Sequence, residues 1–353
     1  MSGLLTFVLI IIVIVGFHES AHFLFMKLWG VKVIRFSIGF GPVLFNKKIG
    51  ETEYQFAVIP LGGYVLPLSR KMDNMDGYKE HAEADAPEKY FEAKPAWQRM
   101  VIYLVGPLSN LLFAFVLYFL LFTCIGLPNE TTVLAEATAD YPAAQAGVKA
   151  GDRIEFIDGK EMKKWSDIVS GIRKSAGKTM KIGVLRDKEK KEFIVTPKEE
   201  ETKDGKIYRI GITPALEYLK MPPGRALKES AVDTYGATMA YANFFKEPFT
   251  GKAKRDSFGG PIMIYQITAE SAKQGAMAIF GLMIMLNMSL FAFNILPIPL
   301  LDGGQIYPAL FEMLTGIKMS ARFEYYWQAA GMLILGSLFI LATWNDLVRI
   351  FFK

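Results

Sequence analysis

A cluster of two histidines and a glutamate near the start of the chain could hold a metal ion and act on water. It reads His18-Glu19-Ser20-Ala21-His22, and residues four apart on a helix lie on one face, one turn apart. This H-E-x-x-H spacing is typical of a zinc site in which the histidines bind the ion and the glutamate is the general base. The chain has only three histidines, so a chance match is rare. We predict His18 and His22 as Zn²⁺ ligands and Glu19 as the catalytic residue, because burying these groups without a metal brings no offsetting gain.

The same site needs a third protein ligand, and Asp302 is the candidate. The stretch from Asn294 to Gly304 contains Pro297 and Pro299, which interrupt regular backbone hydrogen bonding. Irregular backbone at membrane depth is tolerated only where it lines a protected or watery cavity. Asp302 is the one strongly acidic residue of this stretch, so we expect it to complete the site. Two alternatives stay open: Asp302 is a plain loop aspartate, or His81 supplies the third ligand.

The zinc motif lies within an apolar segment, Met1 to Gly30, which is long enough to cross a bilayer only if the motif is counted in it. Ionisable groups at membrane depth mark function. Three further apolar segments predict spans, at Met100–Ile125, Ala276–Leu296 and around Trp327–Ile340. With 52% hydrophobic and 21% charged residues, the chain is too apolar for an ordinary soluble protein and too charged to lie wholly in the membrane. We therefore expect a multi-pass α-helical membrane protein of about four spans, with the lipid bilayer as partner.

Net charge and cysteine content exclude other classes of function. The net charge of +5 is modest and the lysines fall in loops, which argues against nucleic acid as a partner. The single cysteine, Cys124, cannot form an internal disulfide.

The region after the first span changes from helical to strand periodicity. Val33–Pro42 and Glu53–Pro60 predict strands joined by a turn at Asn46–Gly50. We expect a membrane-associated β-hairpin or small sheet, whose edge could pair with an extended substrate; a purely structural hairpin is the alternative. The pair Gly62-Gly63 indicates a bend or a close approach of backbone. The charged stretch Arg70–Arg99 predicts a surface connection.

A β-rich aqueous domain interrupts the membrane segments at residues 128–222. Its segment Pro142–Ile154, followed by Ile157-Asp158-Gly159, resembles the PDZ family. PDZ domains bind peptide ends by adding a strand to a sheet edge, so a peptide C-terminus is an expected partner; a spacer or size gate is the alternative. Pro223–Lys254 predicts an amphipathic helix on the membrane surface. The predicted domains are residues 1–127, 128–222, 223–275 (amphipathic segment and re-entry loop) and 276–353.

Over nearly its whole length the chain resembles the site-2 protease family, the bacterial RseP-type intramembrane zinc metalloproteases. The resemblance is carried by the segments His18–His22, Gly39–Pro42, Tyr90–Met100, Gly106–Asn110, Gly259–Ile262 and Asn294–Gly303, together with the PDZ-like insert. It implies a zinc cofactor held by His18, His22 and Asp302, with Glu19 as general base. It also implies that Asn294 and the loop from Gly39 to Gly41 position the substrate. Asn110 can hydrogen-bond across helices and is predicted with these positioning residues. The best-known members carry two tandem PDZ domains, whereas this insert has room for one.

The resemblance further implies regulated intramembrane proteolysis. The expected substrates are single-span membrane proteins of the anti-sigma-factor type, or remnant signal peptides. Two other functions stay open: a membrane-tethered zinc protease that cuts soluble peptides, and a non-catalytic PDZ scaffold. The loop after the first span is rich in Lys and Arg, which places it in the cytoplasm by the positive-inside rule. We therefore expect a bacterial inner-membrane protein with its active site toward the cytoplasm and the PDZ-like domain outside.

Overall fold

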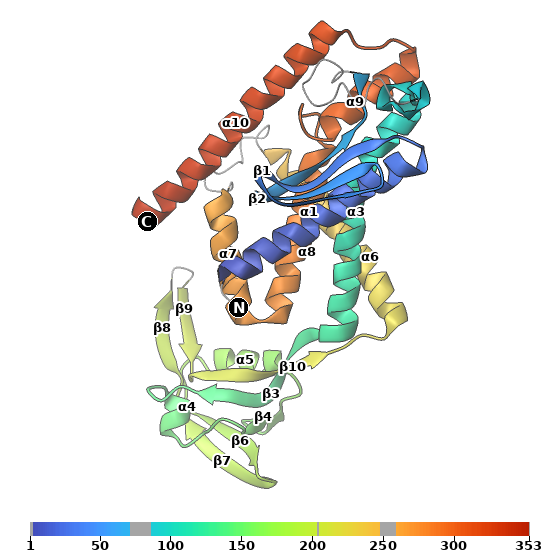
Figure 1. Cartoon of the computed structure of the whole chain (residues 1–353). Helices are drawn as coiled ribbons and strands as arrows, with labels where there is room; N and C mark the ends of the chain where they lie inside the picture. Colours follow the sequence, from blue (N-terminus) through green and yellow to red (C-terminus); the bar gives the residue numbers. More distant parts are fainter. Residues whose placement is uncertain (1–2, 71–85, 203–204, 248–258, 353) are drawn as a thin grey trace. The chain divides into compact units, whose positions relative to one another are not determined.

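The structure is a computed structural model that describes residues 3–70, 86–202, 205–247 and 259–352. The chain divides into two compact units. One comprises Met1–Phe122 together with Pro222–Lys353, and the other is the insert Thr123–Met221. Each unit has its own set of elements (Figure 1), and each is described by itself below.

Four helices of the first unit are long and apolar enough to cross a membrane. They are α1 (Gly3–Leu28), α3 (Ala96–Leu120, continued by a π-helical turn to Ile125), α8 (Ala276–Ile295) and α10 (Ala321–Phe352). All four predicted spans are therefore found, and α10 extends well beyond the apolar centre that revealed it. Together with the sheets described below, these helices confirm the predicted fold class, a four-span α-helical protein with a small sheet and one inserted β-rich domain.

Helix α3 is the central element of this unit. It packs against α1, α8, α9 (Gly303–Thr315) and α6 (Pro223–Phe244), while α7 (Pro261–Gln274) packs against α1 and α8. A buried apolar cluster of Ile10, Ile14, Leu282 and Leu286 joins α1 to α8. Because α1 and α9 both contact α3, segments from the two ends of the chain come together on one helix.

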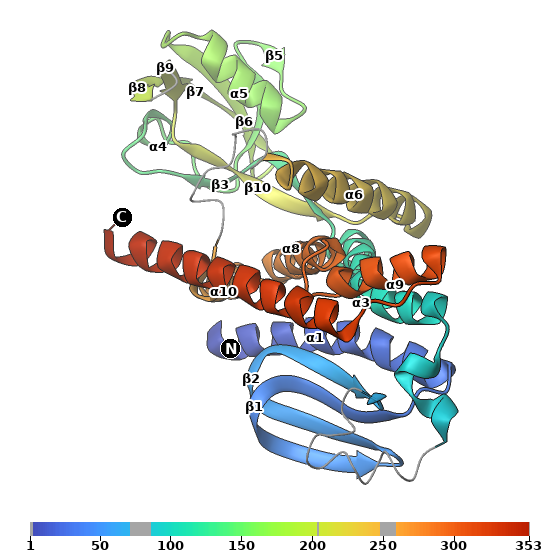
Figure 2. The ribbon, with the colours of Figure 1, turned by 90° about the horizontal axis from the view of Figure 1, so that it is seen from above.

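The small sheet consists of β1 (Val33–Ile49) and β2 (Thr52–Pro67), which lie against α1 (Figure 2). Residues 33–38 pair with residues 53–56 on one side and with residues 63–67 on the other, so β2 folds back around β1. The predicted turn at Asn46–Gly50 was placed too early, since pairing continues as far as Ile49 with Thr52. Among the described residues, the second edge of the segment 61–67 has no strand partner.

The prediction that Arg70–Arg99 is only a surface connection was wrong at its C-terminal end; residues 71–85, which include His81, lie outside the described residues. Short 3₁₀ turns at Pro87–Lys89 and Phe91–Ala93 bury Tyr90 and Phe91. Phe91 packs with residues of α1, β1 and α3. Two aromatic rings in a charged stretch bury enough apolar area to tie it to the core.

The insert is built on an antiparallel sheet with strand order β10-β3-β4-β6-β7, to which β5 adds on β4; β8 and β9 form a separate hairpin. The strands are β3 (Leu127–Ala137), β4 (Arg153–Ile157), β5 (Lys160–Glu161), β6 (Met180–Arg186), β7 (Glu189–Val195), β8 (Lys198–Thr202), β9 (Gly205–Arg209) and β10 (Ile212–Leu219), with helices α4 (Pro142–Gln145) and α5 (Trp165–Lys174). Ile154, Ile168 and Ile182 are fully buried at the centre of its core.

An ion pair supports this insert from within. Asp152 is fully buried and accepts hydrogen bonds from Arg186 Nε at 2.6 Å and Arg186 Nη2 at 2.7 Å. Burial opposes ionisation of Asp152 and is the largest single influence on it. The hydrogen bonds from Arg186 and from the backbone N–H of Lys149, together with the charges of Arg186 and Lys191, outweigh burial and hold the pKa of that carboxyl below its usual value.

Candidate metal centre

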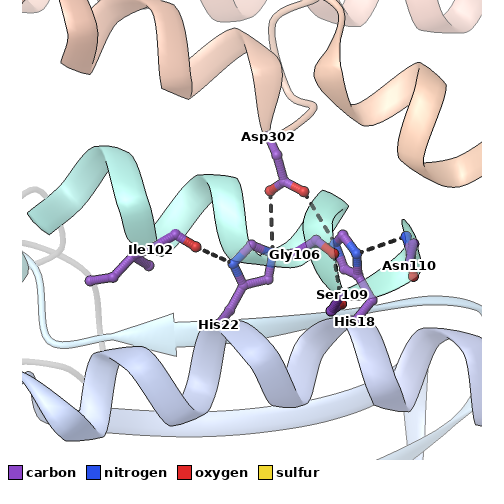
Figure 3. Close-up of polar contacts among 7 residues, drawn as sticks. All are labelled: His18, His22, Ile102, Gly106, Ser109, Asn110 and Asp302. Carbon is purple, nitrogen blue, oxygen red and sulfur yellow. Dashed lines mark hydrogen bonds and ion pairs between the residues drawn. The ribbon is translucent and has the colours of Figure 1, made fainter. Parts of the chain in front are cut away.

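The three side chains predicted as metal ligands converge on one point (Figure 3). His18 Nε2 lies 3.2 Å from Asp302 Oδ2, and His22 Nε2 lies 3.4 Å from Asp302 Oδ1. The two Nε2 atoms are 3.2 Å apart, and one ligand atom from each residue lies within 4.8 Å of the others. Three protein ligands with nitrogen and oxygen donors are the set that catalytic zinc sites use, with the fourth position open.

Asp302 directly precedes α9, and a tight turn of the chain between α8 and α9 brings it to this point. The segment after α8 turns at once, with the N–H of Leu296 donating to Phe293 O and that of Ile298 to Leu296 O. A Cβ on Gly303 would overlap the carbonyl of Leu296, and one on Gly304 would overlap that of Ile298. The two glycines therefore let the start of α9 fold directly against this segment, which holds Asp302 above α1.

Each of the two imidazoles has a partner in α3 at its Nδ1 atom, on the side of the ring away from Asp302. His22 Nδ1 lies 2.6 Å from the carbonyl oxygen of Ile102 in α3, to which it donates. The Nε2 of His22 then carries the lone pair that a metal requires. On the other ring, Nδ1 of His18 lies 3.1 Å from the side-chain amide nitrogen of Asn110. His18, Glu19 and His22 are all buried.

The space between the ligands also fits an ion. A Cβ on Gly106 of α3 would overlap Nε2 and Cε1 of His22 and lie 2.8 Å from Cε1 of His18. Asp302 Oδ2 is buried without a hydrogen-bond partner. Two imidazole nitrogens, an orphaned carboxylate oxygen and a glycine that keeps the space open are what a zinc site of this donor type needs.

Glu19 and Asn294, one of the four predicted substrate-positioning residues, line a cavity of about 410 Å³; Gly39, Gly41 and Asn110 do not line it. Its lining includes the three ligands, Glu19, Asn294, Tyr103 and residues 61–65 of β2. Gly39 and Gly41 occupy the bend of β1 with φ of +94° and +84°, and Phe40 between them lines the cavity. Asn110 does not line it and contacts His18 instead.

The backbone of β2 at Gly63 comes close to the side chain of Glu19. A Cβ on Gly63 would lie 2.9 Å from Glu19 Cγ, 2.9 Å from Val15 Cγ1 and 2.7 Å from Ser37 O. The Gly62-Gly63 pair had indicated a close approach but not its partner. The hydrogen bond from His22 to the Ile102 carbonyl and the space that Gly106 leaves beside the imidazoles were not predicted, because both depend on how α3 faces α1.

Comparisons with known proteins show that this chain is similar to proteases. Residues 6–338 match the model of peptidase family M50. The Regulator of sigma-W protease RasP of Bacillus subtilis is 28% identical, with 99% of each chain covered. A putative zinc metalloprotease of Fusobacterium nucleatum is 30% identical, over 99% of this chain and 97% of that one. Among solved structures, the PDZ domain of the SdrC-like protein of Listeria monocytogenes is 25% identical with a TM-score of 0.22, covering 26% of this chain and 94% of that one.

Proposed function

The chain belongs to peptidase family M50 and is a metalloprotease, and we propose that it cleaves peptide bonds within or near the membrane spans of single-span proteins. The observation that carries this proposal is the position of the candidate metal centre. His18, Glu19 and His22 lie in α1, a helix long and apolar enough to span a bilayer, and α1 packs on α3, a second such helix. A protease whose centre lies in such helices acts where membrane-spanning substrates are found.

We propose Zn²⁺ as the cofactor, held by His18, His22 and Asp302. When bound, zinc supplies a Lewis acid that polarises a carbonyl and makes water nucleophilic near neutral pH. Glu19 lines the same cavity and, as a carboxylate, takes a proton from the attacking water and returns it to the leaving amine. His18, Glu19 and His22 are themselves buried, and burial strengthens the electrostatic interactions among them.

The substrate would bind in an extended conformation along β2. A helical backbone hides its own carbonyls in hydrogen bonds, so a spanning helix must unwind before cleavage. Residues 61–65 line the cavity, and the edge of segment 61–67 lacks a second strand among the described residues. Strand addition at such an edge holds a peptide extended. Gly63 brings this backbone against Glu19, and Asn294 lines the cavity from the last turn of α8, where it would position the substrate together with the Gly39–Gly41 bend.

The substrate class follows from the same resemblance. The Bacillus relative is named Regulator of sigma-W protease RasP, and we propose anti-sigma-type single-span proteins or remnant signal peptides as substrates here. We place the active site toward the cytoplasmic side of a bacterial inner membrane, since the loop after α1 is basic. The PDZ-like insert would then lie outside.

The insert offers a site for a peptide C-terminus. Strand β10 is at the edge of its sheet, and a cavity of about 560 Å³ lies between α5 and residues 207–213. An open strand edge beside a helix accepts an added peptide strand.

Cleavage of a single-span reporter by the full-length protein in proteoliposomes with Zn²⁺ tests the function. We expect Glu19→Gln to abolish cleavage while zinc content stays at one ion per chain, since the ligands are untouched. Glu51→Gln, at the exposed tip of the sheet, is the matched control and should cleave normally. Cleavage by Glu19→Gln at a rate within tenfold of wild type would refute the assignment of the base.

The tethered-protease alternative makes a different prediction. It requires a soluble peptide to be cut as efficiently as the membrane reporter, and zinc to be lost in His81→Ala but kept in Asp302→Ala. We expect zinc to be kept in His81→Ala and lost in Asp302→Ala, because Asp302 lies beside both histidines. The scaffold alternative is set aside by membership of a peptidase family.

A further inference from the structure

Asn110 contacts His18 of the candidate metal centre (Figure 3) and does not line the cavity. It lies in α3, is fully buried, and has its side-chain nitrogen 3.1 Å from His18 Nδ1. Its side-chain oxygen is buried and has no hydrogen-bond partner. An unpaired polar atom in a buried position destabilises the folded state, so a buried amide of this kind beside a candidate metal ligand calls for an explanation.

The chemistry of imidazole supplies the reason. A neutral ring carries its proton on one nitrogen, and a ring that binds metal through Nε2 must carry that proton on Nδ1. An amide –NH₂ group can only donate a hydrogen bond. When it faces His18 Nδ1, that nitrogen must accept, and the proton lies on Nε2. The lone pair of Nε2, the atom that lies 3.2 Å from Asp302 Oδ2, is then taken up by a proton, and this tautomer cannot bind a metal through Nε2.

A half-turn of the amide produces the other tautomer. The oxygen and nitrogen of an asparagine side chain are nearly equal in size, so their exchange needs no repacking. The side-chain oxygen of Asn110 then accepts a hydrogen bond from the N–H at His18 Nδ1 and is no longer unpaired. The lone pair of His18 Nε2 is left facing the metal position. We propose that Asn110 is a positioning residue that holds His18 in its metal-binding tautomer, an inference that rests on the proposed zinc site and replaces the expected substrate contact.

The two histidines differ in this respect. His22 Nδ1 donates to a backbone carbonyl, that of Ile102, which can only accept and so permits one tautomer. His18 depends on a side chain, which can present either a donor or an acceptor. Zinc affinity should therefore respond to the hydrogen-bonding character of residue 110 and not only to its size.

Three variants of the full-length protein separate these roles. Asn110→Leu keeps the number and branching of the side-chain heavy atoms and removes the hydrogen bond. Asn110→Asp keeps only acceptors at this position. Ser109→Ala is the matched control, because Ser109 is also buried in α3 but donates within the helix to Gly106 O. Metal-free melting temperatures show whether each variant is folded.

Zinc titration of the metal-free proteins against a competing chelator at pH 7.5 is the test. We expect Asn110→Leu to bind zinc 10- to 100-fold more weakly, the usual cost of losing such an outer partner. Asn110→Asp and Ser109→Ala should bind within threefold of wild type or more tightly. The visible spectrum of the Co²⁺-substituted protein should change only in Asn110→Leu, since it reports ligand geometry and not stability.

Binding by folded Asn110→Leu within threefold of wild type would overturn the inference, as would equal weakening in Asn110→Asp and Asn110→Leu. If Asn110→Leu does not fold, Asn110→Asp decides by itself, and a tenfold or greater weakening refutes the role as acceptor. Failure of the wild type to bind zinc at all would instead refute the proposed function.

Discussion

Replacement of Gly106 by alanine should remove zinc binding without unfolding the protein. The new methyl group would overlap His22 Nε2, the atom that faces the ion, and would lie 2.8 Å from His18 Cε1. Ordinary van der Waals contact begins at 3.4 Å, so the His18 ring would have to move by at least 0.6 Å, and His22 by more. No other glycine among the described residues would place a Cβ this close to the two rings.

The expected size of the effect follows from how little a zinc site tolerates displacement. Zinc–nitrogen bonds are about 2.0–2.1 Å, and a site must keep them within about 0.2 Å. A shift of 0.6 Å exceeds this tolerance for both histidines, so we expect zinc affinity to fall by at least about 100-fold, more than the loss of an outer partner costs. Helix stability should rise, since alanine is favoured over glycine in a helix by about 1 kcal/mol.

Chelator competition and metal-free thermal melting of the full-length protein measure the two effects separately. Gly281→Ala in α8 is the control, because nothing lies within 4 Å of a Cβ at that position. It should bind zinc and cleave like wild type. Wild-type zinc affinity in Gly106→Ala would show that the ion does not lie between the two rings, and the proposed site would be wrong.

Two further variants test the cavity wall and the insert. Gly63→Ala should lower the cleavage rate at least tenfold with zinc content unchanged, because its Cβ would press on Glu19 and move the base; an unchanged rate would contradict the close approach of β2. In the insert, the pKa of Asp152 is lowered by Arg186, so this carboxylate stabilises the folded state above its unfolded pKa of about 3.9. Hydrogen exchange of β4 and β6 amides in the full chain should show wild type protected more strongly than Asp152→Asn at pH 7, with the difference vanishing as the pH falls through the lowered pKa. A difference that does not depend on pH would mean that the pair acts by packing alone.

Local patterns in the sequence were enough to predict the elements. The spacing of His18 and His22 needs only helical periodicity, and the spans need only length and hydropathy. The span predicted at Ala276–Leu296 is α8, which ends one residue earlier at Ile295. Short-range patterns did not predict the burial of Tyr90 and Phe91, because that burial depends on residues distant in the sequence. They also placed the turn of the hairpin too early, because strand pairing continues to Ile49.

What the sequence by itself determined is therefore the kind of chemistry to expect: two candidate ligands and a candidate base on one helix, and an acidic residue in the irregular segment that follows another span. Only the tertiary structure decided that Asp302 lies against both imidazoles. It also decided that the Ile102 carbonyl lies at Nδ1 of His22 and the Asn110 amide at Nδ1 of His18, and that Gly106 leaves room beside the two rings. The physical reason is that helical periodicity specifies which side chains share a face, whereas the atoms that face one another across helices depend on the packing of α1, α3 and α9 as a whole.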